Sequence, residues 1–183
     1  MNIANKLTLL RLVLVPFFVV FGLIGGNIYG YIALGIFVFA SFTDYLDGYL
    51  ARKYNLVSDF GKFMDPLADK LLVMSALALL VHRGDTSVWI FYVVVIRELV
   101  VTGIRLIASS NGRVIQAAMT GKIKTVIQMI IIILALIPYI NDNFLMVTTD
   151  VGTVLDILMY IMLAVTIISG TEYVVKNADV IKP

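Results

Sequence analysis

Four aspartates form two closely spaced pairs within one short stretch of the chain. Asp44 and Asp47 are three positions apart, and Asp65 and Asp69 are four positions apart. Residues at these separations share one face of an α-helix, so each pair is expected to present its carboxylates together. Converging carboxylates beside hydrocarbon repel one another unless a cation neutralises them. Oxygen ligands favour a hard divalent ion, and four carboxylates could hold the two ions used in phosphoryl chemistry.

Small residues accompany both aspartate pairs. Gly48 and Ala51 follow the first pair, and Gly61 precedes the second. Small side chains let a ligand approach the helix backbone, although a glycine inside a helix costs about 1 kcal/mol relative to alanine. Tight packing between membrane helices would explain each glycine equally well. For the aspartates the alternative is a solvated loop with ordinary charges, and their helical spacing beside apolar runs favours the metal site.

A group of basic residues later in the chain suggests a second kind of chemistry. Arginine contacts a phosphate through two parallel hydrogen bonds and lysine acts as a point charge, so the group predicts a phosphorylated acceptor. The alternative is that these cations face anionic lipid headgroups. The mid-helix pair Arg97-Glu98 is also open, because it could face a polar cavity or form a buried ion pair between helices. The basic residues are Arg105, Arg113, Lys122 and Lys124.

Composition places these charged residues in a membrane protein. Of the 183 residues, 61% are hydrophobic and only 14% are charged, whereas soluble domains are roughly 45–50% apolar. The absence of cysteine excludes disulfides and thiolate metal sites, and the single histidine, His82, excludes multi-histidine sites. A net charge of +2 gives no reason to expect a nucleic-acid partner. The N-terminal residues do not read as a removable signal peptide.

The elements that must position the site are membrane helices. Each span requires about 20 mostly apolar residues, and the apolar runs predict an all-α integral membrane protein with six transmembrane helices in a single domain, residues 1–183. Residues 2–14 alternate apolar and polar positions at helical spacing before Pro16, which predicts an N-terminal amphipathic helix at the membrane interface. The alternative is a plain first span. The runs are Leu9–Ile24, Tyr31–Phe42, Leu71–Val81, Val88–Ile107, Val126–Ile140 and Val151–Ser169.

Positive charge predicts the orientation in the membrane. Of the 14 lysines and arginines, all but two fall in segments on one side of the six expected spans. The exceptions are Arg83, in an opposite connection, and Arg97, in mid-helix. Short cytoplasmic loops retain positive charge, so both termini and the aspartates are expected on the cytoplasmic side of the cell membrane.

The aspartate segment also resembles a known family. The string Asp44-x2-Asp47-Gly48-x2-Ala51-Arg52-x8-Gly61-x3-Asp65-x3-Asp69 matches the signature of the CDP-alcohol phosphotransferases, which are integral membrane enzymes of phospholipid synthesis. The resemblance implies that an alcohol hydroxyl attacks the β-phosphorus of a CDP-linked lipid and that CMP leaves. It also implies six membrane helices and a homodimer.

The same resemblance implies roles for individual residues. Asp44, Asp47 and Asp65 match the ligands of two divalent ions, Mg²⁺ or Mn²⁺, and Asp69 matches the proposed general base, which also lies near a metal. Positions lining the CDP-lipid site are matched by further residues of the signature, namely Gly48, Ala51, Arg52 and Gly61.

Three weaker strings narrow the resemblance to the phosphatidylglycerophosphate synthase branch, which joins CDP-diacylglycerol to sn-glycerol 3-phosphate. They are Asn5-x-Leu7-Thr8-x2-Arg11, Arg97-Glu98 with Arg105, and Gly121-Lys-Ile-Lys-Thr125. The usual proline before the first string is Ala4 here. On this resemblance Asn5 and Thr8 join the CDP-lipid site, and Arg11 joins the acceptor-phosphate group. Inositol phosphate or another alcohol remains an alternative acceptor, and a cation transporter is an alternative outside the enzyme class.

Overall fold

The computed structural model describes residues 3–53, 59–113, 115, 118–137 and 151–181, except the side chains of residues 3–4, 45, 48–53, 59–63, 65, 151 and 180–181. All regular structure in these residues is helical, which confirms the predicted all-α class. The helices are α1 Ile3–Ile24, α2 Asn27–Lys53, α3 Asp59–Arg83, α4 Val88–Ser110, α5 Met119–Leu136, α7 Val151–Lys176 and the short α8 Ala178–Ile181.

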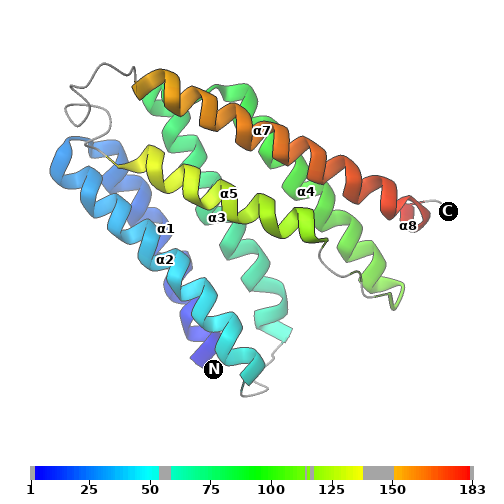
Figure 1. Cartoon of the computed structure of the whole chain (residues 1–183). Helices are drawn as coiled ribbons and strands as arrows, with labels where there is room; N and C mark the ends of the chain where they lie inside the picture. Colours follow the sequence, from blue (N-terminus) through cyan, green and yellow to red (C-terminus); the bar gives the residue numbers. More distant parts are fainter. Residues whose placement is uncertain (1–2, 54–58, 114, 116–117, 138–150, 182–183) are drawn as a thin grey trace.

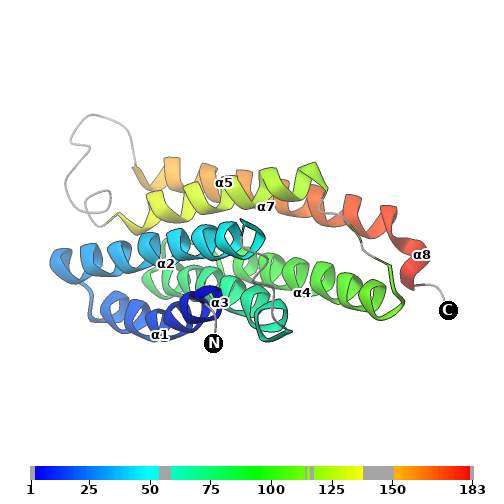
Figure 2. The ribbon, with the colours of Figure 1, turned by 90° about the horizontal axis from the view of Figure 1, so that it is seen from below.

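The long helices pack as two groups that share a boundary. Helix α1 packs along α2 and α3, while α7 packs along α4 and α5. Helices α3 and α5 also contact members of the other group. Figure 2 shows α5 and α7 together on one side of the bundle and α1 and α3 on the other. In Figure 1 the N-terminus lies at the bottom and the C-terminus at the right, both away from the α1–α2 turn.

Two turns between helices depend on glycine. Gly25 and Gly26 have φ angles of 72° and 78° between α1 and α2, and Gly84 has a φ of 82° between α3 and α4. Residues with a β-carbon rarely adopt such left-handed angles, so glycine allows the chain to reverse there without strain. Both turns fall between apolar runs that the sequence predicts as separate spans.

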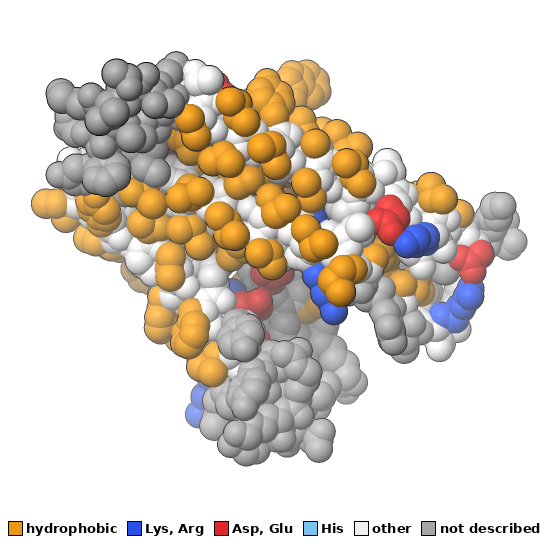
Figure 3. Space-filling model, viewed as in Figure 1, with side chains coloured by type: hydrophobic (Ala, Val, Ile, Leu, Met, Phe, Trp, Pro, Cys, Tyr) orange, Lys and Arg blue, Asp and Glu red, His pale blue; other side chains and the backbone are white. Residues whose placement is uncertain are grey.

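Four described helices are long and apolar enough to cross a membrane. Their spans are Asn5–Ile24, Asn27–Asp44, Met119–Leu136 and Gly152–Lys176. Helices α3 and α4 have comparable lengths, but charged side chains interrupt their apolar stretches, such as Asp69 and Lys70 in α3 and Arg97 and Glu98 in α4. Figure 3 shows apolar side chains spread over the face formed by α2, α5 and α7, while most of the visible charged side chains lie near the centre and at the right of this view. These features agree with a multi-pass membrane protein.

Three polar side chains of helix α1 face the inside of the protein. Asn5, Thr8 and Arg11 are buried, whereas Val13 and Phe17 are more than half exposed. The helix continues through Pro16, where the absent N–H removes one backbone hydrogen bond. The polar pattern in residues 5–11 therefore reflects contact with the rest of the protein. A separate interfacial helix before the first span stays a prediction.

Candidate active site

One arginine joins the first aspartate pair. Arg11 on α1 donates from Nη1 to Asp44 Oδ1 at 2.6 Å and from Nη2 to Asp47 Oδ2 at 2.5 Å. The side chains of Arg11 and Asp47 are 0% and 3% exposed, whereas Asp44 is 40% exposed. The expectation that Asp44 and Asp47 share one face of α2 is therefore confirmed. The cation that neutralises them in this structure is the guanidinium of Arg11.

Several residues of the expected site fall outside the described side chains. The backbones of Gly48, Ala51 and Arg52 belong to α2, and those of Gly61 and Asp65 belong to α3. Their predicted roles stay predictions. Among the side chains that the structure describes, no three acids or histidines are close enough together to hold a metal ion.

Asp69 lies on α3 between the aspartate pair and the basic group. Its carboxylate is close enough to Asp44, Arg11, Lys70 and Glu98 for electrostatic interaction with each of them. Asp69 also lines a cavity of about 180 Å³ between α3, α4 and α5. One carboxylate is thus within reach of both parts of the predicted site.

The cavity beside Asp69 is polar and has an excess of positive charge. Four cations and two acids contribute to its wall. An excess of cations around a small cavity favours an anionic ligand such as a phosphate ester. Thr102 and Thr125 add hydroxyl groups, and Gly121 leaves part of the wall open. The charged lining residues are Asp69, Lys70, Arg97, Glu98, Arg105 and Lys122.

Arg105 is held in place by a residue far along the chain. Its Nε donates to the hydroxyl of Tyr173 on α7 at 3.1 Å, and its guanidinium carbon lies 5.4 Å from the centre of that ring. Tyr173 is buried, so its ring has a defined position. A hydrogen bond and a cation–π contact on one arginine restrict its orientation at the cavity wall.

The basic residues expected to bind the acceptor are not all together. Arg105 and Lys122 line the cavity that contains Asp69, and Lys124 lines a narrower adjoining cavity of about 30 Å³, which Asp69 also lines. Arg113 lies beyond the end of α4, is 62% exposed and pairs with Asp179 at 2.8 Å. Arg11 lies against the aspartates instead.

The structure also places the pair Arg97-Glu98. Both residues line the cavity with Asp69, and they form an ion pair with 2.9 Å between Arg97 Nη1 and Glu98 Oε1. Lys124 on α5 pairs with the same carboxylate oxygen. The sequence left open whether this pair faces a polar cavity or forms an ion pair between helices, and in the structure it does both. Gln128, which also lines the narrower cavity, was not singled out from the sequence because an isolated amide has no diagnostic spacing.

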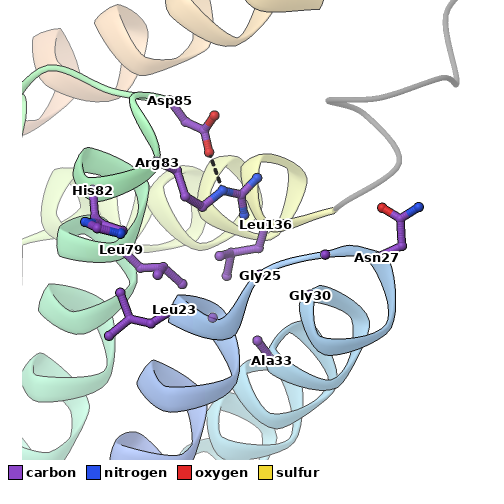
Figure 4. A pocket seen from close by; sticks show the side chains of 12 residues that line it. Leu23, Gly25, Asn27, Gly30, Ala33, Leu79, His82, Arg83, Asp85 and Leu136 are labelled. Carbon is purple, nitrogen blue, oxygen red and sulfur yellow. Dashed lines mark ion pairs between the residues drawn. The ribbon is translucent and has the colours of Figure 1, made fainter.

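A larger cavity of about 340 Å³ lies at the opposite end of the bundle. Figure 4 shows Gly25, Asn27 and His82 at its wall, with the ion pair between Arg83 and Asp85 at 2.8 Å. Helix α3 lines this cavity near its C-terminal end, and a helix rises about 1.5 Å per residue, which separates the cavity from Asp69 along α3. It therefore forms no part of the site around Asp69.

Comparison with known proteins gives one family. Residues 1–172 match the family model described as CDP-alcohol phosphatidyltransferase. The chain is 40% identical to a CDP-diacylglycerol–glycerol-3-phosphate 3-phosphatidyltransferase of Bacillus subtilis, over 99% of this chain and 97% of the relative. It is 40% identical to a probable phosphatidylglycerophosphate synthase of Mycobacterium tuberculosis, over 96% of this chain and 81% of the relative. A Rickettsia bellii protein with the same name as the Bacillus protein is 33% identical, over 94% of this chain and 93% of the relative.

Proposed function

Since residues 1–172 match its model, the chain belongs to the CDP-alcohol phosphatidyltransferase family, and from that premise we propose that it transfers the phosphatidyl group of CDP-diacylglycerol to sn-glycerol 3-phosphate. The products are phosphatidylglycerophosphate and CMP. The relatives named for this acceptor support the choice, because two of them match this chain over nearly their whole length. The observation that carries the proposal is the cavity in which Asp69 faces Arg105 and Lys122.

In the proposed reaction, Asp69 acts on the acceptor alcohol. Its carboxylate takes the hydroxyl proton as the alcohol oxygen bonds to the β-phosphorus, and the bond between that phosphorus and the CMP oxygen breaks. A general base of this kind contributes typically 10²–10⁴-fold to rate. The position of Asp69 between the aspartate pair and the basic cavity suits this role. A covalent enzyme intermediate is not required.

The family generally uses divalent metals, and the donor set of this chain fits such an ion. Asp44 and Asp47 are oxygen ligands that already converge on one cationic group, the guanidinium of Arg11. We assign Asp44, Asp47 and Asp65, with Asp69 beside them, as ligands of two Mg²⁺ or Mn²⁺ ions. Bound there, the ions would neutralise charge on the diphosphate and on the departing CMP.

The remaining site residues divide between the two substrates. For the CDP-lipid we assign Gly48, Ala51, Arg52 and Gly61 of the signature, with Asn5 and Thr8, which share the buried face of α1 with Arg11. For the acceptor phosphate we assign Arg105, Lys122 and Lys124, which border the two cavities that Asp69 lines. Arg11 and Arg113 complete the set of residues that we assign to the acceptor phosphate.

The proposed setting is one membrane domain over residues 1–183 with six spans, an N-terminal interfacial segment and a homodimeric assembly. Both termini and the active site would face the cytoplasm of the cell membrane. The excess of lysine and arginine in the connections on that side supports this orientation. The acyl chains of CDP-diacylglycerol could then stay in the bilayer while soluble glycerol 3-phosphate enters from the cytoplasm.

The test is CMP release by the purified full chain in vesicles that contain CDP-diacylglycerol and Mg²⁺. Acceptors are supplied singly: sn-glycerol 3-phosphate, inositol phosphate, serine and choline. We expect release with glycerol 3-phosphate and little with the others. Release with another alcohol and none with glycerol 3-phosphate would overturn the acceptor assignment. Cation flux without any CMP release would overturn the enzyme assignment.

A further inference from the structure

Glu98 is the centre of a partly buried ionic group that joins three helices. Its Oε1 accepts a hydrogen bond from Arg97 Nη1 at 2.9 Å and another from Lys124 Nζ on α5. Arg97 Nη2 donates in turn to Ser169 Oγ on α7 at 3.3 Å. One carboxylate on α4 therefore connects side chains of α5 and α7.

Lys124 depends on Glu98 for its charge. Its side chain is only 2% exposed, and the carboxylate of Glu98 is the ion-pair partner that the structure gives it. An unpaired ammonium at such a position is strongly unfavourable, because the protein interior solvates charge poorly. The carboxylate of Glu98 thus compensates the charge of Lys124 at a position with little access to water.

The ionic group borders the proposed acceptor site. Glu98 and Lys124 line the narrow cavity with Asp69, and Glu98 and Arg97 line the wider one. Gln128, 3% exposed, lines the narrow cavity, and its Nε2 has no hydrogen-bond partner among the described residues. The cations that Glu98 holds are therefore within the wall that an acceptor phosphate would contact.

We propose that Glu98 is a positioning residue for the acceptor. Its carboxylate keeps the ammonium of Lys124 and the guanidinium of Arg97 oriented at the cavity wall, and those cations interact with the phosphate of the acceptor. Glu98 acts through them and does not touch the reacting atoms. The inference rests on the proposed function, because it assumes an anionic acceptor in this cavity.

The test compares steady-state constants for both substrates in the full chain. Glu98→Gln keeps the size of the side chain but removes its charge, so we expect the KM for glycerol 3-phosphate to rise about tenfold or more. The KM for CDP-diacylglycerol should change less than twofold. Lys124→Met should raise the acceptor KM similarly, and the double variant should raise it by less than the product of the two single effects, because part of the effect of Glu98 acts through Lys124.

Two further variants separate positioning from general destabilisation. Glu172→Gln removes another carboxylate paired with a lysine, Lys176, at 2.5 Å on the surface, and should leave both KM values unchanged. Glu98→Asp keeps the charge, so it should restore much of the acceptor affinity. It also supplies the comparison with wild type if Glu98→Gln does not fold.

The outcomes distinguish this inference from the proposed function. An acceptor KM unchanged in Glu98→Gln, equal increases in both KM values, or multiplied effects in the double variant would each overturn the positioning role. If Glu98→Gln does not fold, a wild-type acceptor KM in Lys124→Met overturns it. Failure of the wild-type chain to release CMP with glycerol 3-phosphate would instead overturn the proposed function itself.

Discussion

At the scale of single residues, the site depends on where a few carboxylates lie. Asp69, on α3, borders the polar cavity and also interacts electrostatically with Asp44 on α2. Asp44 and Asp47 are directed at one cation. The carboxylates therefore have different surroundings, since Asp69 borders the basic cavity whereas Asp44 and Asp47 contact Arg11. Substitution of each aspartate by asparagine should therefore have different effects.

The first prediction concerns Asp69→Asn. Asparagine has nearly the same shape but cannot take the hydroxyl proton, so we expect turnover to fall at least about 100-fold. Binding of CDP-diacylglycerol should remain largely intact. CMP release and equilibrium binding of the lipid measure the two effects. The matched control is Asp156→Asn on the exposed side of α7, which should keep wild-type turnover. Near-normal turnover in Asp69→Asn would contradict the general-base role.

The second prediction concerns Asp44→Asn. Loss of one charged oxygen ligand should weaken metal-dependent binding of the nucleotide, so the Mg²⁺ concentration for half-maximal activity should rise several-fold. A titration of activity against Mg²⁺, repeated with Mn²⁺, measures this change. A metal requirement equal to that of the wild type would count against Asp44 as a ligand.

At the scale of elements, charged contacts define how the helices pair. Arg11 connects α1 to α2 through two carboxylates, and Arg97 connects α4 to α7. In a membrane, polar contacts between helices and close packing at small residues take over much of the role of hydrophobic burial. The stability of these pairs should therefore respond to single polar or glycine substitutions.

The third prediction concerns Arg11→Met. Removal of the guanidinium leaves the buried carboxylate of Asp47 without this partner, and loss of one member of a buried ion pair costs about 3–5 kcal/mol. We expect a clearly lower midpoint of thermal unfolding in detergent. Lys6→Met, on the same helix but exposed, should have little effect. Equal midpoints for the two variants would contradict the link between α1 and α2.

The fourth prediction concerns Gly170→Ala on α7. A β-carbon there would lie 2.9 Å from Cγ of Arg97, so the arginine must shift and its bonds to Glu98 and Ser169 must adjust. We expect a higher KM for the acceptor. Gly103→Ala meets no atom within 4 Å and should instead stabilise α4 by up to about 1 kcal/mol. Similar behaviour of the two alanine variants would contradict the packing of Arg97 against Gly170.

At the scale of the whole molecule, the chemistry and most of the charge lie toward one end of an apolar bundle. Both termini lie at the same end of the bundle in Figure 1. Exposed apolar side chains cover the helices between the two ends, as expected for contact with lipid. The end that carries the site should therefore face one aqueous compartment and the α3–α4 turn the other.

The fifth prediction tests this orientation. The chain contains no cysteine, so one substitution introduces a unique reactive group. In intact cells, His82→Cys should react with a membrane-impermeant thiol reagent, whereas Ser110→Cys should react only after the membrane is opened. Both positions are exposed, and each lies near the C-terminal end of its helix, His82 on α3 and Ser110 on α4. Because α3 and α4 run in opposite directions, the two positions lie at opposite ends of the bundle. The reverse pattern would contradict the cytoplasmic placement of the site.

Local sequence signals were sufficient for the helices and for the common face of Asp44 and Asp47. Apolar runs and glycine turns predicted the helix order, since hydropathy and left-handed turns act over a few residues. Most helices extend beyond the apolar runs, as α2 does from Phe42 to Lys53, because charged residues can continue a helix once its apolar part has ended. Helix α5 differs, since it ends at Leu136 before the end of the run Val126–Ile140. The spacing of Asp44 and Asp47 predicted their common face for the same local reason.

The contacts between distant residues were decided only by tertiary structure. Arg11 could be assigned to the acceptor from its motif, but packing places it against Asp44, 33 positions away. Arg97 reaches Ser169 across 72 positions, and Arg105 reaches Tyr173 across 68. The sequence by itself determined the kinds of helix, the charges that each helix carries and the aspartate motif. Which charges meet in one cavity depends on how the helices pack, and no short-range pattern encodes that arrangement.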